Sequence, residues 1–252
     1  MGGEGGEVPM IDAVRVNNVA LRFPRGRGIL GGIKSIFGWK KNANTNFTAL
    51  ENVTLDVHQG EVLGIIGRNG SGKSTLLRLM AGIYQPDEGV VRVKGQTSLL
   101  AGVRVGLNEH LTGRENVHLY GSILGHKQET MDDMMGDIIE FSEIGDFFDQ
   151  QLRTYSSGMR ARLGIAIASA VEPEILLIDE VLGVGDPQFR EKSKQRILSL
   201  VKSTSTVVLV SHSFGLMREI CDRVAFIHGG KVHCIGDPTQ TIRTYYELTG
   251  KN

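Results

Sequence analysis

The sequence predicts an α/β fold: a mostly parallel sheet covered by helices on both faces, with antiparallel β elements and an inserted helical subdomain. Three observations predict it. Short Val/Ile/Leu runs alternate with helical segments, a glycine-rich loop stands between one such run and a helix, and a purely helical stretch separates two groups of strands. Continuous apolar runs are typical of parallel strands that are buried on both faces.

Two strands of alternating character are expected at 14–21 and 50–57, after a flexible N-terminus of residues 1–10. Between them we expect an insertion at 24–47. From residue 13 to residue 50 the chain carries seven Lys or Arg residues and no acid. Two interpretations of the insertion stay open: a short basic amphipathic helix at a membrane surface, or a solvated segment that packs on its own domain.

The glycine-rich loop is Gly67–Thr75, which fits the phosphate-loop pattern G-x-x-x-x-G-K-[ST]. A strand at 61–66 precedes it and a helix from Leu76 follows it, so a helix N-terminus points at the expected phosphates. Lys73 is expected to reach the β- and γ-phosphates, and the Ser74 hydroxyl to ligate Mg²⁺. This context predicts a P-loop NTPase core of the RecA-like type. The residues of the loop expected to bind nucleotide are Gly67, Asn69, Gly70, Ser71, Gly72, Lys73, Ser74 and Thr75.

A strand is expected at 89–94, and residues 103–160 are expected to form the helical subdomain. Thr112 is the expected N-cap of a helix that begins at Gly113. Residues 129–149 hold eight carboxylates and no Lys or Arg, which we interpret as a solvated helix face.

Strands return in the second half of the chain, and they are expected at 174–180, 206–212, 223–227 and 232–235. The nucleotide-binding core therefore comprises residues 11–102 and 161–240, and residues 241–252 are expected to form a C-terminal tail.

Polar residues stand where two of these strands end. Asp179 and Glu180 directly follow the apolar run 175–178. Asp179 is expected to hold the metal ion, and Glu180 to orient or deprotonate the water that attacks the γ-phosphate. His212 ends another core strand, and strand ends gather near the nucleotide in such sheets. Taken alone, the acidic pair could be a simple strand cap and His212 a structural residue.

A second anion-binding helix tip is indicated at Tyr155–Arg160, because Ser156, Ser157 and Gly158 precede an apolar helix. One compact core does not easily need two phosphate-binding helix ends. A second copy of the chain could present Ser156 across an interface; an ordinary N-cap is the alternative.

Together these motifs resemble the ATP-binding subunit of an ABC transporter, over roughly residues 12–245. The details resemble the ATPases that export O-antigen, capsule or wall teichoic acid. These details are Tyr-Ser-Ser-Gly-Met at 155–159 in place of the commoner Leu-Ser-Gly-Gly-Gln, the segment Leu111–Asn116, and the insertion before residue 50. Relatives with an extra sugar-binding domain carry it after the core, so the chain resembles the short type without one.

The resemblance implies a head-to-tail homodimer that holds two ATP molecules with Mg²⁺. Each ATP would meet the phosphate loop, Asp179, Glu180 and His212 of one copy and the 155–158 segment of the other. Asp186 would belong to the loop that links the two sites. Adenine would stack on an aromatic residue after the first strand. Phe23 stands there, although an apolar core position explains it nearly as well.

The resemblance also implies two copies of an integral membrane permease, docked near residues 101–120, and a lipid-linked polysaccharide substrate. The ATPase would then be a peripheral protein at the cytoplasmic face of the inner or plasma membrane. Two departures are visible. The signature has Ser157 and Met159 in place of its usual second glycine and its glutamine. The family-wide pattern has a glutamine beside the metal at the start of the helical subdomain, where this chain has Val103 or a neighbour, and Gln96 is too early.

Composition agrees with this interpretation. The formal net charge is zero, so no basic field indicates a nucleic-acid partner. Cys221 and Cys234 are expected to be reduced thiols, and no apolar run reaches about 18 residues, the length that a bilayer requires. Two other classes are a soluble ABC-type ATPase of translation or DNA repair, and a P-loop kinase or small GTPase. The first class usually has two cassettes or a long coiled-coil insertion, and the sequence shows neither. Glu180 beside Asp179, the helix that begins at Ser156, and His212 argue against the second class.

Overall fold

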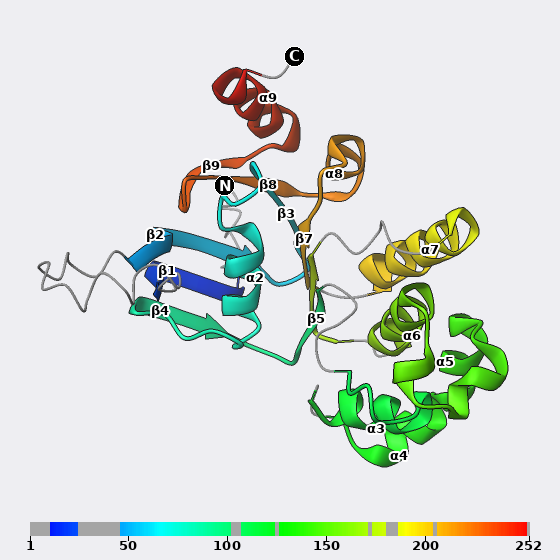
Figure 1. The fold of residues 1–252 in the computed structure, drawn as a ribbon. Helices are drawn as coiled ribbons and strands as arrows, with labels where there is room; N and C mark the ends of the chain where they lie inside the picture. Colours follow the sequence, from blue (N-terminus) through cyan, green and yellow to red (C-terminus); the bar gives the residue numbers. More distant parts are fainter. Residues whose placement is uncertain are drawn as a thin grey trace, which may run out of the picture.

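A computed structural model describes residues 11–24, 46–101, 107–123, 126–170, 173–179, 186–203 and 206–250. Its strands form a six-stranded sheet and a three-stranded sheet (Figure 1). The order in the large sheet is β5-β6-β7-β3-β8-β9, parallel throughout except for β9, which is antiparallel to β8. Its strands are β3 (Val62–Ile66), β5 (Thr97–Ala101), β6 (Ile175–Asp179), β7 (Thr206–Val210), β8 (Arg223–His228) and β9 (Lys231–Gly236).

The large sheet is buried on both faces. The apolar side chains of its strands pack into one hydrophobic cluster on one face and into a second cluster on the other. In β6, Leu176 and Ile178 belong to one cluster of buried residues, and Ile175 and Leu177 to the other. Successive side chains of a strand point to opposite faces, so each strand alternates between the clusters. The mostly parallel sheet predicted from these runs is confirmed.

The small sheet is antiparallel, in the order β2-β1-β4. Its strands are β1 (Asp12–Pro24), β2 (Asn46–His58) and β4 (Glu88–Val93). Pro24 pairs with Asn46 across the first two strands. Most of the predicted insertion, residues 25–45, connects these two positions and falls outside the described residues.

Helices cover both faces of the large sheet. Helix α2 (Lys73–Met80) packs in the core that the small sheet shares. The other face is covered by α6 (Ser157–Ala170), α7 (Pro187–Ser203), α8 (Phe214–Ile220) and α9 (Pro238–Thr249) (Figure 1). Among the described residues, none of the helices has the length and apolarity needed to cross a bilayer.

Most of the expected C-terminal tail, residues 241–249, is instead part of a helix. Helix α9 begins at Pro238, where Asp237 accepts a hydrogen bond from the Gln240 amide and Pro fits the first helical position. Ile242 and Tyr245 bury one side of α9 in the core. The prediction failed because these residues are few and their apolar partners are far away in the sequence.

The helical subdomain consists of α3 (Gly113–Ile123), α4 (Gln128–Asp133), α5 (Met135–Ser142) and the 3₁₀ turns η1 (Gly145–Asp149) and η2 (Leu152–Thr154). The predicted cap of α3 is confirmed. Thr112 Oγ1 accepts from the Glu115 amide at 3.2 Å, and Glu115 Oε2 accepts from the Thr112 amide at 2.8 Å. This reciprocal pair is a capping box.

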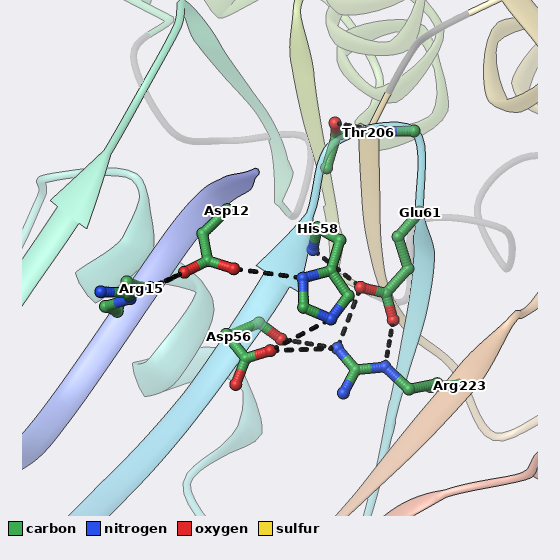
Figure 2. A network of polar contacts seen from close by, with 8 residues as sticks. Asp12, Arg15, Asp56, His58, Glu61, Thr206 and Arg223 are labelled. Carbon is green, nitrogen blue, oxygen red and sulfur yellow. Dashed lines mark hydrogen bonds and ion pairs between the residues drawn. The ribbon is translucent and has the colours of Figure 1, made fainter. Parts of the chain in front are cut away.

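A polar network joins the two sheets (Figure 2). Glu61 is only 6% exposed. Its carboxylate accepts from Arg223 Nε at 2.6 Å, from Arg223 Nη2 at 3.0 Å and from the His58 amide at 2.8 Å. His58 lies between Asp12, 3.1 Å from Nδ1, and Asp56, 3.3 Å from Nε2. Because Glu61 precedes β3 and His58 ends β2, the network fixes the small sheet against the large one.

The same network brings Asp12, Asp56 and His58 close enough to hold a metal ion, with one ligand atom of each within 4.8 Å of the others. Burial raises the pKa of Asp12, but hydrogen bonds from Arg15 and His58 outweigh it and leave the pKa below its ordinary value. Arg223 lies 3.6 Å from Asp56. Since neighbouring cations already balance these carboxylates, we interpret the cluster as an ion-pair network.

Replacing Glu61 by Gln is expected to lower the free energy of unfolding by about 2 kcal/mol, because the half-buried Arg223 loses its bidentate partner. Denaturant titration measures this. The matched control is Glu51→Gln, which removes an exposed pair with Lys231 and is expected to cost under about 1 kcal/mol. Equal costs for the two variants would contradict the structural role of Glu61.

Candidate functional site

The glycine-rich loop lies between β3 and α2, as predicted, but α2 begins at Lys73, three residues before the expected start at Leu76. Its first glycine, Gly67, lies against β8: a Cβ there would stand 2.3 Å from the Ile227 carbonyl oxygen, so no side chain fits. Gly72 adopts a left-handed φ of 106°, and a Cβ there would meet the Ala49 carbonyl at 2.8 Å. The two glycines therefore allow the loop to fold closely over its neighbours. Asn69 and Gly70 form the exposed turn between them.

Lys73 is the buried cation of the loop, with 7% of its surface exposed. Its Nζ donates to the carbonyl oxygens of Gly67 at 2.8 Å and Arg68 at 3.0 Å. The two carbonyl oxygens thus hold the ammonium group against the start of the loop. An anion in this loop would meet a positive charge that is already positioned.

A small pocket opens beside this lysine, with a volume of about 170 Å³. Its lining residues are Phe47, Ala49, Gly70, Gly72, Lys73, Ser74 and Thr75. Pockets for whole drug-sized ligands are typically about 300 Å³ or larger. The space therefore suits a chain of phosphates, with the rest of a nucleotide outside.

Ser74 and Asp179 form the candidate metal site. Ser74 Oγ donates to Asp179 Oδ1 at 3.0 Å. The sheet register explains why they meet: Asp179 pairs with Val210, and Val210 pairs with Ile65, so the ends of β6, β7 and β3 lie side by side. A hydroxyl and a carboxylate are hard oxygen ligands of the kind that Mg²⁺ prefers.

A second, independent observation indicates that the glycine-rich loop suits a phosphate group. Ser71 is 6% exposed, and its Oγ finds no hydrogen-bond partner within the described part of the chain. A buried hydroxyl without a partner is costly, so such groups usually bind water or a ligand. Phosphate oxygens in this loop would supply the missing partner.

His212 stands two residues after the end of β7, at the same sheet edge as Asp179, and its side chain is exposed. Glu180, the predicted base, falls outside the described residues, although Asp179 directly before it is described. The position expected for the family's glutamine, near Val103, also lies outside them.

The predicted second helix tip begins α6. Ser156 is exposed, and its Oγ accepts from the Met159 amide at 3.1 Å, which makes it the N-cap. Ser157 and Gly158 form the first turn. Tyr155 is placed differently from the expectation that it binds the ligand: its side chain is buried, and its hydroxyl donates to the Phe147 carbonyl at 2.6 Å. Burial raises the pKa of Tyr155 to about 12, so it stays a donor that anchors the tip.

The two helix tips lie on opposite faces of the large sheet (Figure 1). Within the described part of the chain, none of the residues 155–158 lines the pocket beside Lys73. The phosphate loop and the α6 tip are therefore both present, but a single copy of the chain does not bring them together.

Asp186 caps α7. Its Oδ1 accepts from the amides of Gln188 at 3.1 Å and Phe189 at 3.0 Å, and its Oδ2 accepts from Arg162. The hydrogen bond from the Phe189 amide is the largest cause that lowers the pKa of Asp186 to about 2, followed by the bond from Arg162. Asp186 is therefore ionised across the physiological range.

Phe47 is an aromatic residue that the sequence analysis missed. It is 50% exposed and lines the pocket. Phe23, the predicted stacking residue, is its cross-strand partner and is partly buried in the core, with its ring 5.4 Å from that of Tyr84. Two interpretations of Phe23 were open, adenine stacking and an apolar core position, and the structure favours the core position. The only available signal for Phe47 was its place at the end of the insertion.

Comparison with known proteins gives consistent matches. Residues 50–183 match the ABC transporter family. The teichoic acids export ATP-binding protein TagH of Enterococcus faecalis is 44% identical over 213 residues, which cover 84% of this chain and 47% of that protein. The O-antigen export system ATP-binding protein RfbB of Klebsiella pneumoniae is 39% identical over 241 residues, which cover 94% and 98%.

The chain spans only 47% to 64% of the length of the TagH proteins of Enterococcus faecalis and Listeria. Among solved structures, the dimeric ATP-binding cassette MJ0796 bound to ADP and Pi superposes with a TM-score of 0.69 at 23% identity, covering 89% of this chain and 98% of that one. This likeness shows the fold, and the predicted architecture is confirmed by it.

Proposed function

The chain belongs to the ABC transporter family, and we propose that it is the ATP-hydrolysing subunit of an exporter for a lipid-linked polysaccharide. One observation carries the catalytic part of this proposal. Buried Lys73 and Ser74 line one pocket, and Ser74 donates to Asp179, so a cation and two oxygen ligands of the kind that phosphoryl transfer requires lie together.

ATP would place its β- and γ-phosphates in the loop, beside Lys73 and the amides of the α2 tip. Ser74 and Asp179 would hold Mg²⁺, which neutralises phosphate charge when bound. Glu180 would orient the attacking water or accept its proton, and His212 would donate to a γ-phosphate oxygen. The chain's own contribution is positioning and charge stabilisation, and these account for most of the catalysis in this class of reaction.

We assign the contact with the adenine ring of ATP to Phe47. An exposed aromatic ring at the mouth of a phosphate-sized pocket offers a flat face for adenine. Phe47→Ala is expected to raise the KM for ATP about fivefold with little change in kcat, because stacking is kept in the transition state. Phe23→Ala is the control, expected to reduce stability and leave the KM near that of the wild type. Steady-state kinetics at several ATP concentrations separates them, and the reverse pattern would restore Phe23 as the stacking residue.

Two copies would assemble head to tail, so that Ser156, Ser157 and Gly158 of one copy face the ATP held by the other. The position of Ser156 across the sheet from Lys73 supports this arrangement. The α6 tip is exposed, with its helix N-terminus open to an anion. ATP would then be the link between the copies, and its hydrolysis would release them.

The transport partner is proposed from the relatives, which are named as export proteins for teichoic acids and O-antigen. Two copies of an integral membrane permease would dock between the core and the helical subdomain, near residues 101–120, at the cytoplasmic face of the membrane. No nucleic acid is expected as a partner, since the net charge is zero. Co-expression with candidate integral membrane permeases from the same organism tests the assignment. We expect the two proteins to purify together, whereas isolation of the ATPase alone would favour a soluble ABC-type ATPase.

The basic insertion would lie near the membrane, where Lys34, Lys40 and Lys41 could meet lipid headgroups or the pyrophosphate end of the substrate. Neutralising these three lysines together is expected to reduce export several-fold while the basal ATPase rate stays unchanged. Export in cells and ATP hydrolysis by the purified chain measure the two effects. Unchanged export would reject the membrane role and leave the solvated-surface interpretation.

A further inference from the structure

Arg162 joins three elements around the second helix tip. It lies on α6, six residues after Ser156, and its side chain is 21% exposed. Nη1 donates to Glu143 Oε2 at 3.1 Å, at the end of α5. Nη2 donates to Asp186, at the start of α7. The guanidinium also lies over the Phe189 ring, 4.7 Å from its centroid. A planar guanidinium can hold several acceptors in one fixed geometry, which an ammonium group cannot.

The contact with Asp186 is specific, because the two oxygens of that carboxylate have separate tasks. Oδ1 caps α7 through the amides of Gln188 and Phe189. Oδ2 is left for Arg162. Since the carboxylate is ionised at neutral pH, the pair is charge-assisted and hence strong for a hydrogen bond.

We propose that Arg162 is a positioning residue of the ATPase, which holds Asp186 and the start of α7 in register with the α6 tip that carries Ser156. The inference rests on the proposed function. Asp186 follows Glu180 by six residues in the sequence, and Ser156 is expected to meet ATP. Arg162 therefore links Asp186, six residues after the proposed base, to the helix that carries Ser156.

A merely structural role would make different predictions, because α5 and α7 are already joined by other cations. Lys192 contacts Glu143 at 2.5 Å, and Arg196 pairs with Asp137 at 2.5 Å. Arg196 also lies over an aromatic ring, that of Phe141, at 5.5 Å, and it reaches α6 only at Ser169, far along the helix from Ser156. Arg196 thus repeats the chemistry of Arg162 without touching Asp186, and it provides a matched control.

The test compares Arg162→Gln, Asp186→Asn, their double variant and Arg196→Gln in the full chain. Asn at 186 keeps an oxygen for the α7 cap and removes the charge that Arg162 binds. We expect Arg162→Gln to lower kcat on the order of tenfold with the KM for ATP unchanged within about twofold. We expect Arg196→Gln to keep the wild-type kcat, although it lowers the melting temperature at least as much as Arg162→Gln does. The double variant should show no further loss beyond Arg162→Gln, because the two residues act through one contact.

The possible outcomes separate the two claims. If Arg162→Gln and Arg196→Gln have the same kcat, or if the losses of Arg162→Gln and Asp186→Asn multiply, the positioning role is overturned and the proposed function stands. If the wild-type chain does not hydrolyse ATP, both the proposed function and this inference are overturned.

Discussion

Replacing Glu180 by Gln is expected to reduce ATP hydrolysis by about 100-fold or more, since a positioned general base typically contributes that much. Binding should survive, because Gln keeps the size of the side chain and Lys73, Ser74 and Asp179 are untouched. Two copies should therefore remain clamped around ATP. Single-turnover kinetics measures the first effect, and size-exclusion chromatography with ATP shows the second as a stable dimer.

The matched control for this prediction is Glu174→Gln. Glu174 precedes the same strand, β6, at its opposite end, where it accepts from the Gln96 amide at 3.1 Å. The control should keep the wild-type rate and should form no trapped dimer. Turnover at the wild-type rate by Glu180→Gln would show that another group acts as the base.

Replacing Lys73 by Ala is expected to weaken ATP binding on the order of 100-fold and to abolish turnover. Removing one partner of a buried, charge-assisted contact typically costs about 2–5 kcal/mol. Lys73→Arg is expected to fail as well, because a longer, planar guanidinium cannot place one donor atom between the Gly67 and Arg68 carbonyl oxygens as the Lys73 ammonium does. Titration with ATP gives the dissociation constants.

Arg78→Ala provides the control for the lysine. Arg78 is the cation in the last turn of the same helix, and it does not line the pocket. Its loss should leave ATP affinity within about twofold of the wild type, which is the usual range for a distant surface charge. Wild-type affinity in Lys73→Ala would refute the phosphate site.

The sequence predicted best those parts of the site that depend on contiguous residues. Gly67–Thr75 specifies a loop whose shape follows from glycines and one helix start, so the positions of Lys73 and Ser74 beside that loop could be predicted. Asp179 could be placed because a short apolar run fixes where its strand ends. The Thr112 cap was predictable for the same reason: its partner, Glu115, is three residues away.

Contacts between distant residues could not be predicted in this way. Phe23 and Phe47 are direct cross-strand partners, and only the folded sheet shows which of the rings faces the pocket. The acidic run at 129–149 was interpreted as a solvated face, yet Asp137 and Glu143 pair with cations of α6 and α7. Strand β5 was missed, because its short segment begins with Thr97 and Ser98 and is identified only by its pairing with β6.

The most direct test of the shared site is disulfide trapping between two differently tagged copies, one carrying Asn69→Cys and the other Ser156→Cys. Both positions are exposed, and Cys221 and Cys234 are first replaced by Ala. The account predicts an ATP-dependent disulfide that joins the two tags. The absence of a disulfide between the two tagged copies with ATP bound would contradict the account. So would a double variant, Asn69→Cys with Ser156→Cys in one chain, that forms the disulfide only within that chain.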